Sequence, residues 1–205
     1  LTSIKGYAET LLDEKFRASE SSDHFVHTII KNANQMSHVV NDLLELTKLQ
    51  QLRKPLHELE TVDAAACFNS AFETCLPILQ EKKIHIDNRI TGSMLVMADD
   101  NSLIQVFRNL LDNAIRYSPA ETRITAYAWE EMDKQRNKAM YIFAIQDEGG
   151  GIPLRYQKRI FERFYRVDKE RSRDSGGTGL GLAICRNAVA GMDGKIWLKS
   201  PPDGE

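Results

Sequence analysis

Residues 109–119 read NLLDNAIRYSP, and this stretch decides how the rest of the chain is interpreted. Apolar residues recur through it at helical spacing, which predicts an amphipathic helix over residues 101–117. Asn109, Asn113, Arg116 and Tyr117 fall along one border of its apolar face. Because each asparagine costs a helix interior about 0.5 kcal/mol relative to alanine, two of them one turn apart suggest amide oxygens that hold a metal ion, with a cation beside them for phosphate. A solvated polar edge explains the same border equally well.

A carboxylate follows the next apolar strand along the chain. The apolar pattern predicts a strand over residues 140–146. The next residues, 147–153, read DEGGGIP. Glycines there would let a ligand approach the backbone closely. The ionised carboxylate of Asp147 only accepts hydrogen bonds, so it suits the amine of adenine and repels the keto oxygen of guanine. A plain glycine turn, with Pro153 opening a helix, is the alternative and is favoured if this stretch is taken alone.

A second glycine-rich run, GGTGLGL at residues 176–182, precedes a helix predicted to start near Thr178 and to run to Ala190. Backbone N–H groups at a helix start can hold phosphate oxygens, although a flexible hinge is an equal alternative. The run is neither a P-loop nor a dinucleotide fingerprint, because no Gly-Lys-Ser/Thr follows it and no strand precedes it. The basic segment before it suits a movable cover over a triphosphate, with Arg166 as its candidate phosphate contact.

The N-terminal quarter predicts a helical hairpin. Apolar residues at helical spacing mark helices over residues 1–14 and 26–46, with a polar connection between them. Two such helices cannot cover both of their apolar stripes, so a second copy is expected to complete a four-helix bundle. Pro55 marks a linker, which divides the chain into a hairpin at residues 1–53 and a second domain at residues 54–205.

The second domain mixes helices and strands, so we expect an α+β fold. Its architecture should be a two-layer α/β sandwich with helices on one face of a sheet. The helices are expected at residues 59–81, 101–117 and 178–190. The strands are expected at residues 84–90, 94–98, 122–129, 140–146 and 195–199, with residues 130–138 as a hairpin connection.

Composition excludes several classes of protein. The 205 residues carry a net charge of −2, which offers no general attraction for nucleic acid or an acidic membrane. Three cysteines without paired spacing argue against a disulfide framework and fit a reducing cytosol. The five histidines show no metal-ligand or triad spacing. No apolar run approaches the roughly 18 residues of a membrane span, so any membrane anchor is expected upstream of Leu1.

Four stretches stand in one order: NLLDNAIRYSP, DEGGGIP, IFERFYRVD (residues 160–168) and GGTGLGLAI (residues 176–184). Together they resemble the asparagine box, first glycine box, phenylalanine box and second glycine box of the sensor histidine kinases of two-component systems. The opening LTSIKGYAETLL resembles the family sequence that directly follows the phospho-acceptor motif, in the style of phosphate-regulon sensors. The resemblance covers nearly the whole chain, and it implies a Bergerat-type ATP-binding fold behind a dimeric hairpin.

The resemblance also implies roles for individual residues. Asn113 would be the magnesium ligand, Asp147 the adenine-reading carboxylate, and Phe161 and Phe164 the packing residues that anchor the cover. The implied ATP-binding set is Asn109, Asn113, Arg116, Tyr117, Asp147, Gly149, Gly151, Ile152, Arg166, Gly177, Thr178, Gly179, Leu180, Gly181 and Leu182.

The function implied by the resemblance is ATP- and magnesium-dependent autophosphorylation of a histidine, followed by transfer to an aspartate of a response-regulator receiver domain. The partners would be a second copy of the chain and that receiver domain, in the cytoplasmic portion of a membrane-anchored bacterial sensor. The acceptor histidine is expected six residues before Leu1, so no catalytic residue is expected in the chain itself.

Two rivals remain. One is an ATPase of the gyrase, MutL or heat-shock type, which carries a glutamate where this chain has Asn109. The other is a dimeric scaffold with a degenerate nucleotide site. The chain also departs from the family in two places: Met192-Asp193-Gly194 replaces a common His-Gly-Gly, a change expected to be harmless, and a further family strand is expected beyond Glu205.

Overall fold

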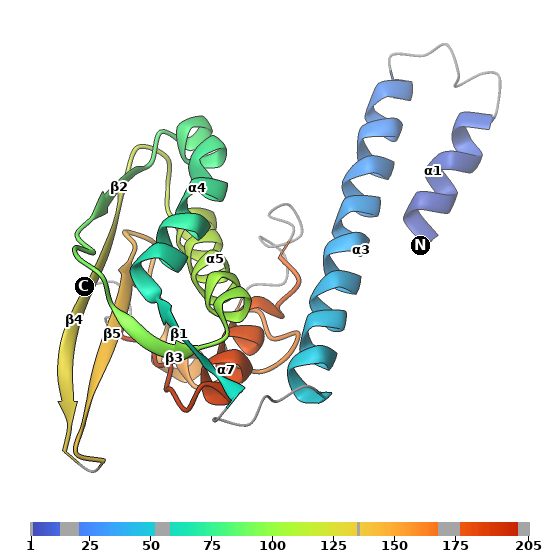
Figure 1. The fold of residues 1–205 in the computed structure, drawn as a ribbon. Coiled ribbons are helices and arrows are strands. Elements are labelled where there is room, and N and C mark those ends of the chain that lie inside the picture. The colour runs from blue at the N-terminus through green and yellow to red at the C-terminus, as the bar shows by residue number, and fades with distance from the viewer. Residues whose placement is uncertain (1, 13–20, 52–57, 135, 168–176, 201–205) are drawn as a thin grey trace.

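The computed structural model describes residues 2–12, 21–51, 58–134, 136–167 and 177–200. The predicted hairpin is confirmed, since α1 (Thr2–Leu12) and α3 (Ser21–Gln51) lie side by side and run antiparallel (Figure 1). Tyr7 and Phe25 stack across them with ring centroids 5.4 Å apart. None of the described helices is long and apolar enough to cross a bilayer.

Two sheets make up the strands of the second domain. The larger has the order β2-β4-β5, with β2 (His85–Asn88) parallel to β4 (Arg123–Asp133) and β4 antiparallel to β5 (Lys138–Gln146). The smaller pairs β1 (Glu60–Asp63) antiparallel with β3 (Leu95–Ala98).

Helices α4 (Ala64–Lys82) and α5 (Asp100–Tyr117) cover one face of the larger sheet (Figure 1). Three aromatic rings connect the layers: the ring of Phe107 lies 5.5 Å from that of Phe68 in α4 and 5.2 Å from that of Phe143 in β5. Along β4, buried Ile124 and Ala126 alternate with outward residues, as expected for a strand covered on one side. The predicted two-layer sandwich is therefore confirmed.

Side-chain caps determine where the central helices begin. Asp63 accepts hydrogen bonds from the backbone N–H groups of Met94 and Ala65, both at 3.0 Å, and so joins the start of α4 to the segment before β3. These bonds, the one from Met94 first, lower the pKa of Asp63 because they favour its ionised form. Asp99 caps α5 in the same way through the N–H of Ser102.

Helix α7 (Gly181–Gly191) packs between α5 and the C-terminal half of α3 (Figure 1). It begins three residues later than the sequence predicted, because Gly179 has a φ of +72° and cannot continue a right-handed helix. The short helix α6 (Leu154–Gln157) follows Pro153.

Three other expectations about strands and helices were wrong. Residues 60–63 form strand β1 and not helix, since pairing with β3 overrides the helical pattern that continues into α4. Strands β4 and β5 extend through most of residues 130–138, because Glu130 and Asp133 pair with Tyr141 and Lys138. Residues 195–199 are described but form no strand.

Candidate functional site

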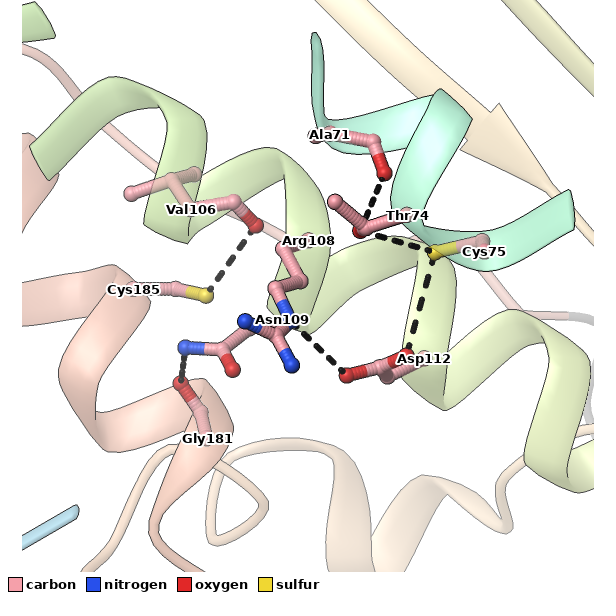
Figure 2. Close-up of polar contacts among 9 residues, drawn as sticks. All are labelled: Ala71, Thr74, Cys75, Val106, Arg108, Asn109, Asp112, Gly181 and Cys185. Carbon is pink, nitrogen blue, oxygen red and sulfur yellow. Dashed lines mark hydrogen bonds and ion pairs between the residues drawn. The ribbon is translucent and has the colours of Figure 1, made fainter. Parts of the chain in front are cut away.

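The polar border of α5 meets the start of α7 at Asn109. Its Nδ2 lies 3.5 Å from the carbonyl oxygen of Gly181 and donates to it (Figure 2). Beside it, burial raises the pKa of the Cys185 thiol to about 12, while a hydrogen bond with Asn109 acts in the opposite direction. The sulfur lies 3.7 Å from the carbonyl oxygen of Val106. Asn109 therefore joins α5 to the end of the second glycine run.

Asn113 lies one turn further along the same helix. Its side chain is half-buried and makes no hydrogen bond within the part of the chain that the structure describes. No group of three histidine, cysteine, aspartate or glutamate side chains among the described residues could hold a metal ion. The amide oxygen of Asn113 is a hard ligand of the kind that a divalent cation takes together with phosphate oxygens.

Two arginines converge at Gly177. A Cβ built on this glycine would collide with the guanidinium of Arg116 and would lie 3.8 Å from Nη2 of Arg166. Arg116 comes from the last turn of α5 and Arg166 from the phenylalanine-box stretch, 50 positions away by number. Two like charges at one glycine favour an anion between them.

The first glycine stretch packs against the C-terminal end of α5. The N–H of Gly149 donates to Oδ1 of Asp147 at 2.8 Å, which leaves Oδ2 without a hydrogen bond among the described residues. A Cβ on Gly149 would lie 2.7 Å from Oδ1 of Asp147 and 2.9 Å from the carbonyl oxygen of Tyr117. Only glycine allows the backbone to approach this closely. The close approach keeps Asp147 next to the end of α5. Gly151 adopts a φ of +71°, and the N–H of Ile152 donates to Ser200 Oγ.

The phenylalanine stretch contacts the second glycine run through the backbone. The N–H of Phe164 donates to the carbonyl oxygen of Gly179 at 2.9 Å, and a Cβ on Gly179 would lie 3.0 Å from the backbone of Phe164. The expectation that Phe164 is a packing residue was wrong. The residue is 57% exposed, and its backbone takes a left-handed φ of +61°. Phe161 is half-buried.

The structure thus brings together most of the residues implied by the sequence. Asn109 donates a hydrogen bond to Gly181. Arg116 and Arg166 lie next to Gly177, and the backbone of Tyr117 lies next to Gly149. Asn113, Gly151, Ile152 and Leu182 have no described contact with the rest of the set. The basic segment predicted as a cover runs over residues 155–174, and its part from residue 168 onward lies outside the described residues, as do Pro55 and His57.

One contact of this site comes from the hairpin and was not foreseen. The hydroxyl of Thr178 donates to Oδ2 of Asp42 in α3 at 2.6 Å and accepts from the N–H of Leu180 at 3.1 Å. Leu180 and Ile184 are fully buried and pack with Leu46, one turn beyond Asp42 on α3. The only signal in the sequence is an acid inside the apolar pattern of α3.

Two further groups near the site were also missed. Asp112 lies between Asn109 and Asn113 in sequence, with Cys75 Sγ 3.9 Å from its Oδ1 and Arg108 Nε 4.0 Å from its Oδ2 (Figure 2). Burial raises the pKa of Asp112, and the positive charges of Arg108 and Arg116 only partly offset this. Ser118 is buried at the end of α5, and its hydroxyl has no hydrogen-bond partner among the described residues.

Known proteins share both parts of this arrangement. Residues 98–205 match the family model of histidine kinase-, DNA gyrase B-, and HSP90-like ATPases, and residues 1–52 match that of the His Kinase A (phospho-acceptor) domain. The chain is 30% identical to the sensor histidine kinase WalK of Bacillus subtilis, over 98% of this chain and 32% of WalK. It is 33% identical to the sensor-like histidine kinase SenX3 of Mycolicibacterium smegmatis, over 87% of this chain and 44% of SenX3. The chain therefore spans 32% of the length of WalK and 44% of that of SenX3.

Solved structures of histidine kinases are also similar to this chain. The histidine kinase AdeS of Acinetobacter baumannii superposes with a TM-score of 0.71 at 26% identity, over 98% of this chain and 89% of that one. Full-length ShkA, determined in complex with AMPPNP, superposes with a TM-score of 0.67 at 25% identity, over 98% of this chain and 41% of that one. With a phospho-acceptor domain ahead of an ATPase domain, the chain belongs to the sensor histidine kinases of two-component systems.

Proposed function

We propose that this chain binds ATP with magnesium and supplies the γ-phosphoryl group to a histidine of the hairpin domain, from which a response-regulator aspartate receives it. The observation that carries the proposal is the convergence of Arg116 and Arg166 on Gly177, at the same end of α5 where Tyr117 meets Gly149. An anion site and a candidate adenine site are thereby held by neighbouring residues of one helix.

The adenine end of the proposed site rests on Asp147. Its Oδ1 is held by the N–H of Gly149, so Oδ2 is left to accept from the exocyclic amine of adenine. Gly149, Gly151 and Ile152 would line this end, since the absence of a side chain at Gly149 keeps the backbone of Tyr117 close. Guanine presents a keto oxygen where adenine has its amine, so the same carboxylate would repel GTP.

The phosphate end rests on α5 and the start of α7. Arg116 and Arg166 would neutralise phosphate charge, and backbone N–H groups from Gly177 to Leu182 would donate to phosphate oxygens at the helix start. A magnesium ion fits beside Asn113, because the amide oxygen there is a hard ligand with no other described hydrogen bond. When bound, magnesium would stabilise the charge of the transferring phosphoryl group.

Asn109 favours transfer to histidine over hydrolysis. The gyrase, MutL and heat-shock ATPases would need a carboxylate at this position to activate water, and an amide cannot accept that proton. In this chain the amide also donates to the carbonyl oxygen of Gly181. The residues around α5 would therefore position and orient the nucleotide, and proton removal from water is not among their roles.

The remaining parts of the proposal concern the whole protein. We place the hairpin at residues 1–53, the catalytic domain at residues 54–205, and the acceptor histidine upstream of Leu1, as the opening LTSIKGYAETLL suggests. The exposed apolar residues of α3 support a homodimer through a four-helix bundle. Three free thiols, all buried, fit a cytoplasmic portion of a sensor protein, anchored in the membrane by other segments.

Nucleotide binding tests the site, and labelling tests the reaction. Calorimetry should show binding of ATP with magnesium and discrimination against GTP. In the chain extended upstream through the acceptor motif, label from the γ-phosphate should appear as acid-labile phosphohistidine. Asn113→Ala should abolish that label by removing the proposed magnesium ligand, whereas Asn101→Ala, an exposed asparagine at the start of the same helix, should leave it unchanged. Equal affinity for GTP would disprove the role of Asp147.

A further inference from the structure

Within the described residues, the hairpin reaches the candidate phosphate site through the acidic side chain of Asp42. Oδ2 of Asp42 on α3 accepts a 2.6 Å hydrogen bond from the hydroxyl of Thr178, and the same hydroxyl accepts from the N–H of Leu180. Asp42 is thus bonded to the loop whose N–H groups are candidates for phosphate binding.

An apolar contact holds α3 in this position independently of charge. Leu46, one turn after Asp42, is 3% exposed and packs with Leu180 and Ile184, which are both 0% exposed. Burial of these three side chains stabilises the docked arrangement whether or not Asp42 is ionised. The hydrogen bond that the Asp42 carboxylate accepts from Thr178 stabilises this docked arrangement further, by an amount that depends on the local electrostatic field.

That field should become more negative when a nucleotide binds, because a triphosphate brings several negative charges. Without a ligand, the guanidinium of Arg116 at Gly177, next to Thr178, favours a nearby negative charge. A triphosphate held by Arg116, Arg166 and the loop N–H groups would cancel that positive charge and place several negative charges close to Asp42. A carboxylate and a phosphate at neighbouring positions repel each other, most strongly where water is partly excluded.

We propose that docking of α3 through Asp42 and binding of phosphate-bearing nucleotides oppose each other at Thr178, so that the hairpin senses whether the site is occupied. This rests on the proposed function, because it requires the second glycine run to hold phosphates. Coupling between two sites is reciprocal: if nucleotide loosens α3, then docked α3 lowers the affinity for nucleotide by the same factor.

The test uses the chain as it stands and replaces Asp42 by asparagine. Asp42→Asn keeps an oxygen that accepts from Thr178 but removes the charge, so it separates repulsion from loss of the hydrogen bond. Calorimetry with a non-hydrolysable ATP analogue and magnesium should show affinity raised about fivefold, in the lower range of measured coupling between sites. Affinity for adenosine, which has no phosphate, should be unchanged.

Asp23→Asn is the matched control. It removes the same charge from an exposed position in the first turn of α3, about 28 Å along the helix, where screening makes its effect on the site negligible. Its affinity for the ATP analogue should equal that of the unaltered chain.

A second readout tests reciprocity. Addition of the ATP analogue should speed hydrogen exchange around Asp42 and Leu46 in the unaltered chain, and should do so less in Asp42→Asn. Unchanged or weakened analogue binding by Asp42→Asn, or an equal gain for adenosine, would overturn the inference while leaving the proposed nucleotide site intact. If the unaltered chain bound no nucleotide, both the proposed function and this inference would fail.

Discussion

Gly149 shows how one missing side chain shapes the candidate adenine site. A Cβ at this position would lie 2.7 Å from Oδ1 of Asp147 and 2.9 Å from the carbonyl oxygen of Tyr117. Contacts this short force a shift, and one of the two neighbours is backbone. The distance between Asp147 and the end of α5 therefore depends on glycine here.

Gly149→Ala should weaken ATP binding at least about tenfold and destabilise the fold by about 1–3 kcal/mol, the usual effect of overpacking. Gly150→Ala is the control, since a Cβ on Gly150 would meet nothing within 4 Å. Calorimetry and thermal unfolding of both variants check this. Equal behaviour of the two variants would contradict the crowding argument.

Asp112 and Asp87 should respond to pH with opposite signs. Burial raises the pKa of Asp112, so the folded state disfavours its charge at neutral pH, and this penalty is relieved as pH falls through the raised pKa. The hydrogen bond from Arg89 lowers the pKa of Asp87, so the stabilisation it supplies is present at neutral pH and is lost on acidification.

We therefore expect Asp112→Asn to raise the melting temperature at about pH 7. The gain should shrink as pH falls through the raised pKa of Asp112 and should be absent below about pH 4, near the pKa of an unfolded aspartate. Asp87→Asn should lower the melting temperature at about pH 7, and its deficit should shrink in acid. Melting curves across this range check both variants. A lower melting temperature of Asp112→Asn at neutral pH would show that the arginines outweigh burial.

At the scale of elements, Lys82 fastens the end of α5. Its Nζ, in the last turn of α4, donates to the carbonyl oxygen of Ile115 at 2.7 Å and lies 3.4 Å from that of Arg116. A cation here satisfies carbonyl groups that have no partner within the helix and interacts favourably with the helix dipole. The turn that carries Arg116 and Tyr117 is held in place from the neighbouring helix.

Lys82→Met should lower the free energy of unfolding by about 1–3 kcal/mol, because it keeps the apolar stem but leaves these carbonyl oxygens without their donor. Nucleotide affinity should fall as well. Lys83→Met is the neighbouring control, because that side chain is 75% exposed and pairs only with Glu121. Its effect should stay within about 0.5 kcal/mol. Urea unfolding measures both, and similar losses would remove the special role of Lys82.

At the scale of the whole molecule, α3 has two distinct sets of apolar residues, one buried against the catalytic domain and one exposed. Leu46 packs with Leu180 and Ile184 of the catalytic domain, whereas Val26, Ile30, Val40, Leu43 and Leu44 remain exposed. A row of exposed apolar residues along one helix is typical of a surface covered by another chain. The proposed homodimer would cover it.

Leu44→Lys should therefore convert the dimer to a monomer, because it places a charge in the proposed bundle interface. Size-exclusion chromatography with light scattering should then give the mass of one chain. Leu95→Lys is the control: Leu95 is equally prominent on the surface, but it lies on β3 in the other domain. A monomeric unaltered chain would contradict the dimer proposal.

Local patterns in the sequence predicted most elements of this fold. The helices α3 and α5 and the strand β3 depend mainly on apolar periodicity, which is encoded within each segment. Strand β1 was missed because its conformation depends on pairing with β3, more than 30 residues away by number. The predicted strand at residues 195–199 was wrong for a related reason: an alternating pattern forms a strand only where a neighbour accepts it.

The sequence by itself also predicted the residues of the candidate site, because its four stretches stand in the order of the family's boxes. Only the tertiary structure decided which of them touch: Arg116 with Gly177, Tyr117 with Gly149, and Asn109 with Gly181. Only the structure shows that Asp42 accepts a hydrogen bond from Thr178, 136 positions away, and that Phe164 is exposed. The physical reason is that residue type and spacing report on local conformation, whereas contacts between distant segments arise from the packing of the whole chain.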